Sequence, residues 1–497
     1  MGLAARTVSS CLERPARHVS RHASDPRGLV RGPRTPILEA AITAPVIPLA
    51  PHGLPLVGHA LRLRNNPLEF FESLRDYGDI VGIELGPRRA YVLNSPALIR
   101  EMLVVKPRMF NKGAQIQGGK DLLGNGLLSS EGETHRRHRL MMQPAFRRER
   151  IALYAQTMQQ QLVERTATWR DGQVLDAQIE LSSLTLAVAT KTLISSEIGK
   201  DLIAEMLHSL PRIFDLLYRR LVTPVSLLNR LPLPRNREYA ARLARLHPMV
   251  DKVIADYRAE DIPRDDLLSM MLRLRSEEDG SGMTDEEIHS QVASILVAGT
   301  ETAAATLCWT FHLLSRSPEA EARLHAEVDD VLGGRPASFA DLPRLTYTGQ
   351  VIREALRCYP PAWFITREAV DDVELGGYRI PRGTPVMYST YAVHRDSRWY
   401  PDPERFDPDR WSSERVDSIP REAILPFGSG ARKCIGDVFA LVETTLAVAT
   451  IATGWRMSAE PGAVVEKVAT TTLVPRNLHL TLHRRSADPA GNLAVEP

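Results

Sequence analysis

The stretch FGSGARKCIG, residues Phe427–Gly436, decides how this sequence is interpreted. It places Cys434 among three glycines, with Arg432 two residues before the cysteine. Residues 437–455 then follow with helical spacing and no proline. We therefore predict a glycine-rich loop that leads into a buried helix. A cysteine just before a helix is also expected to favour the thiolate, because it feels the positive end of the helix dipole.

This loop has the features of a site for a flat, anionic cofactor. Gly428 and Gly436 allow close approach of a ligand to the backbone. Arg432 can pair with a carboxylate of that ligand, and Cys434 offers a thiolate. These features fit a haem iron held by one cysteine. The alternative is a buried structural cysteine beside an ordinary turn, but the five fixed positions of the pattern FxxGxRxCxG favour the cofactor site.

Residues 284–315 give the strongest helix signal in the chain. Thr284 and Glu287 form a capping box at its start, and Pro318 limits its end. A helix of about thirty residues is ~45 Å long. The sequence therefore predicts one helix that crosses the whole molecule.

The middle of this helix carries the segment Ala298–Thr302, AGTET. Gly299 removes a side chain where a flat cofactor can press against the helix, and Glu301 and Thr302 form an acid–alcohol pair beside it. The Thr302 hydroxyl can bond to a carbonyl one turn earlier. A plain helix with one glycine and two polar residues is the alternative, and the cysteine loop downstream favours the cofactor site.

Together, these segments resemble the cytochrome P-450 superfamily, the haem-thiolate monooxygenases, over residues 45–484. The resemblance implies a mainly α fold with a minor β region and a single catalytic domain around haem b. It also implies that Cys434 ligates the iron and that Glu301 and Thr302 relay protons to bound oxygen. The cofactor-binding residues would then include Ala298, Gly299, Phe427, Gly428, Arg432 and Gly436.

The basic segment at residues 133–150 adds to the resemblance. His135 and Arg139 lie four residues apart and share a helical face. The resemblance implies that they hold haem propionates, together with Arg367 and Arg432. For Arg136, Arg137, Arg147 and Arg148 we expect a solvated basic face, which can dock an acidic partner.

Glu354 and Arg357 form an ExxR pair, which alone is a weak signal because such pairs are common on exposed helices. The downstream segment PERF, with Arg405, strengthens it. The resemblance implies that Glu354, Arg357 and Arg405 form a buried structural triad, not a catalytic one.

The composition excludes several classes of function. A formal net charge of +2 argues against a nucleic-acid partner. Four scattered cysteines indicate a reducing compartment, and the apolar runs are too short to span a membrane, so we expect a cytoplasmic protein. Because eukaryotic members of the family usually carry an amino-terminal anchor, the resemblance then implies a soluble, bacterial-type enzyme, which we expect to be a monomer. The sequence has no flavin or iron–sulfur motif, which implies a separate ferredoxin and ferredoxin reductase besides O₂. A peroxygenase, an isomerase and a non-catalytic haem sensor or carrier are alternatives that the Glu301-Thr302 pair disfavours.

The substrate is expected to be small and apolar. The chain resembles terpene-oxidising actinobacterial members of the family most strongly in PLVGHALR, LGPRRAYV, LMMQPAFRR and GARKCIGD. This favours a sesquiterpene-sized hydrocarbon in secondary metabolism, such as antibiotic biosynthesis, with a steroid or fatty acid as the alternative. The predicted pocket residues are Phe110, Ile116, Leu122, Ala298, Ala303, Trp363, Phe364, Ile365, Thr472 and Leu473.

The remaining expectations concern chain organisation. Residues 1–44 have the composition of a transit peptide or of a disordered extension, and we favour the extension. Residues 485–497 are predicted to be a disordered tail. Hairpins are expected at residues 80–93, 372–389 and 466–483, the last with its turn at Pro475–Asn477. The prolines within residues 217–236 predict a loop region.

Overall fold

We describe the protein from a computed structural model. It describes residues 45–194, 200–223, 226–229, 231–260, 266–275 and 280–485. The predicted extension at residues 1–44 and the tail from residue 486 lie outside the described residues.

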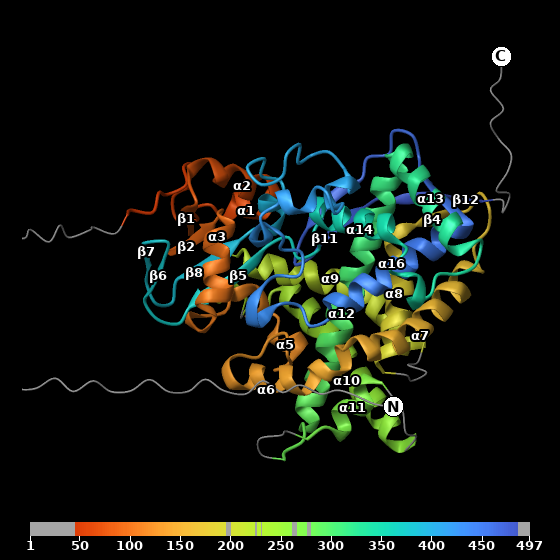
Figure 1. The fold of residues 1–497 in the computed structure, drawn as a ribbon. Helices are drawn as coiled ribbons and strands as arrows, with labels where there is room; N and C mark the ends of the chain where they lie inside the picture. The colour runs from red at the N-terminus through yellow and green to blue at the C-terminus, as the bar shows by residue number, and fades with distance from the viewer. Residues whose placement is uncertain are drawn as a thin grey trace, which may run out of the picture. The chain divides into compact units, whose positions relative to one another are not determined.

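Helices dominate the described chain (Figure 1). The longer ones are α6 (Gly132–Met142), α7 (Arg148–Thr166), α8 (Ala177–Leu193), α9 (Lys200–Leu221), α10 (Pro234–Glu260), α12 (Asp285–Ser315), α13 (Pro318–Leu332), α14 (Thr346–Cys358) and α16 (Asp437–Gly454). The shorter ones are α1 (Ala60–Asn65), α2 (Pro67–Ser73), α3 (Pro96–Arg100), α4 (Ala114–Gln117), α5 (Lys120–Leu123), α11 (Leu267–Arg273) and α15 (Thr390–His394).

The strands form small sheets. A five-stranded sheet has the order β1 (Ile80–Leu85), β2 (Arg88–Leu93), β8 (Pro385–Tyr388), β5 (Ile365–Ala369) and β3 (Phe110–Lys112). A three-stranded sheet joins β4 (Val174–Asp176), β12 (His479–Arg484) and β9 (Trp455–Ala459), at the opposite side of the view in Figure 1. Two pairs remain, β6 (Val373–Leu375) with β7 (Tyr378–Ile380), and β10 (Glu466–Ala469) with β11 (Leu473–Arg476). The mainly α fold with a minor β region is confirmed.

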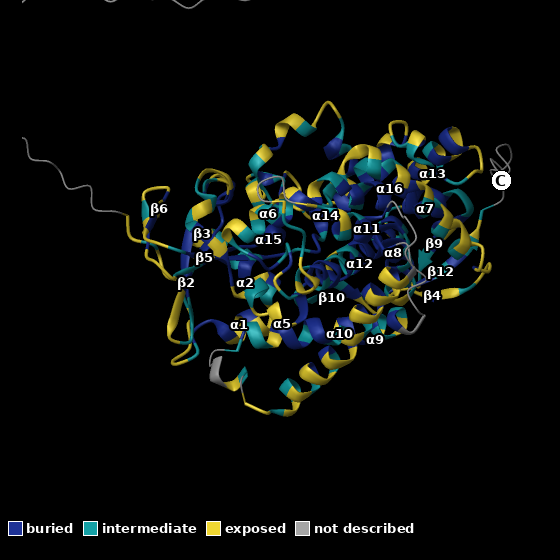
Figure 2. Cartoon of the chain, turned by 90° about the horizontal axis from the view of Figure 1, so that it is seen from below, coloured by how far each residue is buried: buried dark blue, intermediate teal, exposed yellow. Residues whose placement is uncertain are grey.

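The central helix α12 is the predicted long helix. Thr284 caps it, and its hydroxyl accepts from the Glu287 amide at 3.2 Å while the Glu287 carboxylate accepts from the Thr284 amide at 2.8 Å. Most of its residues are buried, and it packs against α8, α14 and α16 (Figure 2). The capping box therefore fixes the residue at which α12 begins, and residues 298–302 then lie in the middle of this helix.

Two described helices, α12 and α16, are long and apolar enough to cross a membrane by length and composition. In both, most of the apolar window is buried within the protein, 72% in α12 and 67% in α16. This burial is what the central helices of a globular core require.

The predicted hairpins are confirmed in part. β1 and β2 pair as expected, and β6 and β7 turn at Gly376-Gly377. The C-terminal hairpin is confirmed as the pair of β10 and β11, but its predicted division at Pro475–Asn477 is wrong, because Pro475 lies inside β11 and the turn falls at residues 470–472. Proline is compatible with a strand when its missing N–H lies at an edge, and β11 belongs to a sheet of two strands.

Candidate active site

The cysteine loop is held by its own backbone. The amide of Cys434 donates to the carbonyl of Phe427 at 3.0 Å. Gly430 has a φ of +70°, and a Cβ at that position would lie 2.1 Å from the carbonyl oxygen of Leu103. Gly428 also has a positive φ, of +66°. The loop can thus take this course only with glycine at residue 430, and its backbone conformation favours glycine at residue 428.

Cys434 is the accessible cysteine of the described chain, since Cys308 and Cys358 are buried. Although its surface is reachable, protein surrounds its sulfur, and this burial raises the pKa of the thiol. The amide of Gly436, Arg139 and Lys433 oppose that shift, while Asp437 adds to it. Burial therefore opposes the thiolate that the sequence leads us to expect at this position. A bound cation deprotonates such a thiol outright.

The middle of α12 also keeps accessible surface. Ala298 is exposed and Gly299 and Thr302 are half-buried within a helix that is otherwise largely buried. A Cβ added at Gly299 would meet no protein heavy atom within 4 Å, so protein packing does not explain this glycine. The Thr302 hydroxyl donates to the Ala298 carbonyl at 2.7 Å, as predicted, and α12 remains continuous.

A cluster of basic side chains lies beside the cysteine loop. Its members lie close enough together for one charge to shift the pKa of another. They are His135, Arg139, Arg367 and Arg432. Burial and the neighbouring cations lower the pKa of His135 to about 3, and burial lowers the pKa of the Arg367 guanidinium. A buried excess of positive charge requires an anion, so the donor set fits the carboxylates of a haem.

Lys112 is a member of this cluster that the sequence did not reveal. It is 6% exposed, and burial lowers its pKa to about 7, with Glu131 opposing and Arg432 and Arg367 adding to the shift. Its ammonium donates to the carbonyls of Leu127 and Ser130, both at 2.8 Å. A single lysine in a glycine-rich segment carries no pattern, so nothing in the sequence marks it.

Glu354 and Arg357 form a buried bidentate ion pair, with distances of 2.9 and 2.8 Å. Arg357 also donates to the carbonyls of His394, Pro403 and Arg405, at 2.9, 2.7 and 3.1 Å. The pair therefore fixes the chain that precedes the cysteine loop.

The assignment of Arg405 to this triad needs a correction. Its side chain is exposed and it contributes only its carbonyl to Arg357. The second guanidinium at Glu354 is that of Arg410, which is 3% exposed and lies 3.4 Å from the carboxylate. The indole of Trp411 donates to the same carboxylate at 2.8 Å.

His394 connects this network to the loop. Its Nε2 accepts from the amide of Leu425 at 3.2 Å, and the Tyr400 hydroxyl donates to the carbonyl of Ala423 at 3.0 Å. The sequence showed no physical reason for this histidine, and the structure supplies one.

Glu301 is paired with a residue from the far end of the chain. The hydroxyl of Thr472, in the turn before β11, donates to the Glu301 carboxyl at 2.8 Å. Burial raises the pKa of Glu301 to about 8, and the Thr472 hydroxyl opposes that shift. Glu301 therefore carries a proton at neutral pH, although part of its surface remains accessible.

The predicted pocket residues lie in several different environments. Phe110, Trp363, Phe364 and Leu473 are at most 2% exposed and belong to hydrophobic core clusters, so their assignment to a pocket wall is corrected. Ala303 is also buried. Thr472 is buried as well, and its hydroxyl donates to the Glu301 carboxyl. Ile116, Ala298 and Ile365 keep accessible surface. Leu122 lines a small apolar cavity with residues of α9, α10 and α12.

Residues 48–482 match the cytochrome P450 family. The chain belongs to the cytochrome P450 family. It is 45% identical to cyclooctatin synthase of Streptomyces melanosporofaciens, over 84% of this chain and 91% of the relative. It is also 45% identical to pentalenene oxygenase of Streptomyces avermitilis, over 88% and 97%. Cyclooctat-9-en-7-ol 5-monooxygenase of S. melanosporofaciens is 44% identical, over 88% and 95%.

The protein is thus a cytochrome P450 monooxygenase. Membership in the family implies a haem-thiolate cofactor, redox partners and O₂. The accessible Cys434 and the buried basic cluster are consistent with that cofactor.

Proposed function

We propose that this P450 uses haem b, with Cys434 as the axial iron ligand, to hydroxylate a cyclic terpenoid hydrocarbon. The observation that carries the proposal is the accessible Cys434 in a glycine-constrained loop beside a buried excess of basic side chains. The cofactor supplies the oxygen chemistry, and the protein supplies ligation, protons and shape.

The basic cluster would hold the haem carboxylates. Lys112, His135, Arg367 and Arg432 are its candidates. Arg139 bonds the carbonyl of Lys433 at 2.7 Å, so it also stabilises the cysteine loop. Phe427, Gly428, Gly436, Ala298 and Gly299 would form the walls against which the macrocycle lies.

Proton delivery is proposed for Glu301 and Thr302. A carboxyl with a pKa of about 8 can release and regain a proton near neutral pH. Thr302 is the next residue on α12, and its hydroxyl donates to the carbonyl of Ala298. This acid–alcohol pair also argues against a non-catalytic haem sensor. The sensor would be excluded by showing that the protein accepts electrons from a ferredoxin and forms product as it does so.

The substrate class is proposed from the relatives, whose names describe a pentalenene oxygenase and a cyclooctat-9-en-7-ol monooxygenase. The accessible side chains of Ile116, Ala298 and Ile365 are apolar, and an apolar wall stabilises apolar surface by ~25 cal/mol per Å². A sesquiterpene-sized ring system is therefore the preferred substrate, with a fatty acid or steroid as the alternative.

The test is a titration of the holoenzyme with a cyclic sesquiterpene, a cyclic diterpene alcohol, a steroid and a long-chain fatty acid. The proposal predicts a change of the haem iron from low to high spin, and a hydroxylated product, with a terpenoid. Spin change and turnover confined to the steroid or the fatty acid would overturn the terpenoid assignment and leave the monooxygenase standing.

We propose that a ferredoxin and its ferredoxin reductase donate the electrons. The protein is proposed to be a monomer and to act in the cytoplasm. The docking face would comprise the exposed Arg136, Arg147, Arg148 and Lys433. Arg137 does not belong to this face, because it pairs with Glu287 at 2.8 Å and so supports the start of α12.

A further inference from the structure

The turn between β10 and β11 is pinned from two sides. The indole of Trp363 donates to the carbonyl of Thr470 at 2.8 Å, and the indole of Trp309 donates to the carbonyl of Leu473 at 3.1 Å. Both tryptophans are essentially fully buried. The amide of Leu473 donates to the carbonyl of Pro361 at 3.0 Å. The backbone of this turn is therefore fixed relative to α12, because Trp309 lies on that helix.

Thr472 occupies the centre of the pinned turn. Its own carbonyl accepts from the Thr470 amide at 3.1 Å, and its side chain is 6% exposed. Its hydroxyl donates to Oε2 of Glu301 at 2.8 Å. A hydroxyl held in this way gives the carboxyl one orientation, since the lost bond would leave a buried polar group without a partner.

The orientation has a chemical consequence for the proton. In a neutral carboxyl the carbonyl oxygen is the better acceptor, so the bond from Thr472 favours Oε2 as the carbonyl oxygen and Oε1 as the oxygen that carries the hydrogen. The proton of Glu301 is then presented by one defined atom, on the stretch of α12 that carries Ala298 and Thr302.

We propose that Thr472 is a positioning residue, which orients the carboxyl of Glu301 so that Oε1 is its proton-donating oxygen. This inference rests on the proposed role of Glu301 in proton delivery. The turn before β11 would then contribute to the reaction, although Thr472 and Glu301 lie 171 residues apart in the sequence. Trp309 and Trp363 act one step further away, by holding the turn.

The chain offers a matched pair of variants. Thr472→Val removes the hydroxyl and keeps the shape, whereas Thr472→Ser keeps the hydroxyl. Thr471→Val makes the same change one residue away, at a hydroxyl that has no hydrogen-bond partner among the described residues. This last variant controls for packing of the turn.

The primary measurement needs no turnover. The Glu301 carboxyl is followed by infrared pH titration of the holoenzyme, with its band assigned by Glu301→Gln. Because the Thr472 hydroxyl lowers the pKa of Glu301, Thr472→Val should move the midpoint upward by about one unit. In Thr472→Ser and Thr471→Val, the titration midpoint of Glu301 should equal that of the wild-type protein.

The second measurement is the ratio of product to reductant consumed. Thr472→Val should lower this ratio and raise peroxide release, and Thr472→Ser should restore both. An unchanged midpoint in Thr472→Val would overturn the positioning role. A shifted midpoint with unchanged coupling would retain that role and remove Glu301 from proton delivery, which is a failure of the proposed function.

Discussion

Arg432 and Glu131 form an ion pair 2.6 Å long that joins the cysteine loop to the residue before α6. The amide of Lys112 donates to the other oxygen of the same carboxylate. Glu131 is therefore the acid that balances the basic cluster, and it neutralises only part of that charge. An anionic cofactor would bind where this balance is incomplete.

Lys112 should make cofactor retention depend on pH. Its pKa in the protein is about 7, and an anionic partner would raise it. Lys112 therefore contributes its full share of the cofactor affinity below about pH 7. This contribution declines as the pH rises from about 7 to the higher pKa that Lys112 has in the complex, and is lost above it. Haem loss to an acceptor protein should accelerate with pH, by about tenfold or more at the limit.

In Lys112→Met, haem loss should be fast throughout and should show less dependence on pH. Lys120→Met is the control, because Lys120 is exposed on the neighbouring helix α5. Equal retention by both variants would remove Lys112 from the cofactor site.

The corrected triad makes a prediction about stability. Replacing Arg357 with Ala leaves Glu354 buried without its partner and should lower the free energy of unfolding by ~3 kcal/mol or more. Arg410→Ala should also destabilise, because Arg410 is buried beside the same carboxylate. Arg405→Ala should stay within ~0.5 kcal/mol, since its side chain is exposed. Thermal unfolding measures all three, and a large loss in Arg405→Ala would restore it to the triad.

Proton delivery can be tested at Thr302. Thr302→Ala should still consume reductant but should release more peroxide and less product, while Thr302→Ser retains the hydroxyl and the coupling. Oxygen, peroxide and product are measured together. If coupling is the same in both variants, Thr302 serves the packing of α12 alone.

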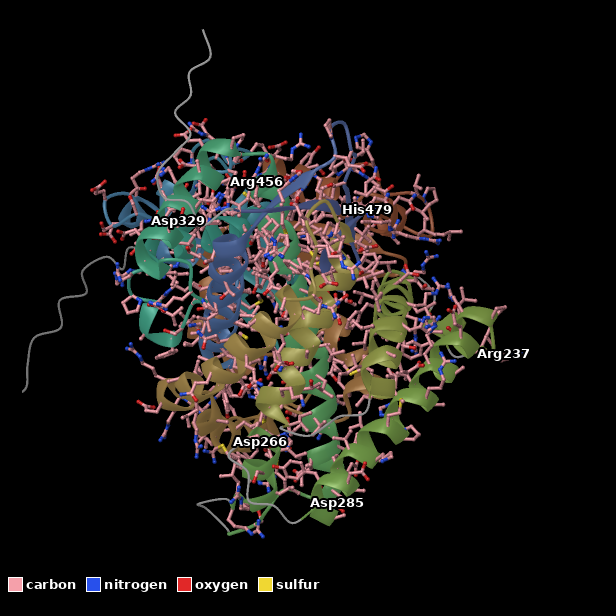
Figure 3. All side chains as sticks on the ribbon, turned by 90° about the vertical axis from the view of Figure 1, so that its right-hand side faces the viewer. Arg237, Asp266, Asp285, Asp329, Arg456 and His479 are labelled. Atoms are coloured by element: carbon pink, nitrogen blue, oxygen red, sulfur yellow. The ribbon has the colours of Figure 1, made fainter. Side chains whose placement is uncertain are left out.

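Electron transfer should depend on the exposed arginines at the start of α7. Reversing Arg147 and Arg148 to Glu should slow reduction by an acidic ferredoxin about tenfold or more at low salt. The effect should shrink as salt rises, because the screening length falls to about 10 Å at 0.1 M. Arg237→Glu on α10, at the outer edge of the ribbon in Figure 3, is the control. Slowing that does not change with ionic strength would indicate misfolding.

The sequence predicted the features that depend on local chemistry. The capping box at Thr284, the turn at Gly376-Gly377 and the glycine loop around Cys434 are each defined by a few neighbouring residues. Predictions failed where distant segments compete. Arg405 and Arg410 both follow prolines in the same segment, and only tertiary packing buries one of them. Pro475 resembles a turn residue, but pairing with β10 makes it part of a strand. Lys112 and the Thr472–Glu301 bond arise from the fold, so no local pattern reveals them.

The central claim is that Cys434 is the axial ligand of the iron, and the reduced carbon monoxide complex tests it most directly. Thiolate ligation produces a strongly red-shifted Soret band. This band should be present in the unchanged protein, should persist in Cys308→Ser and Cys358→Ser, and should be absent in Cys434→Ala. A red-shifted band that survives in Cys434→Ala, or that disappears on replacing Cys308 or Cys358 in a folded protein, would contradict the account.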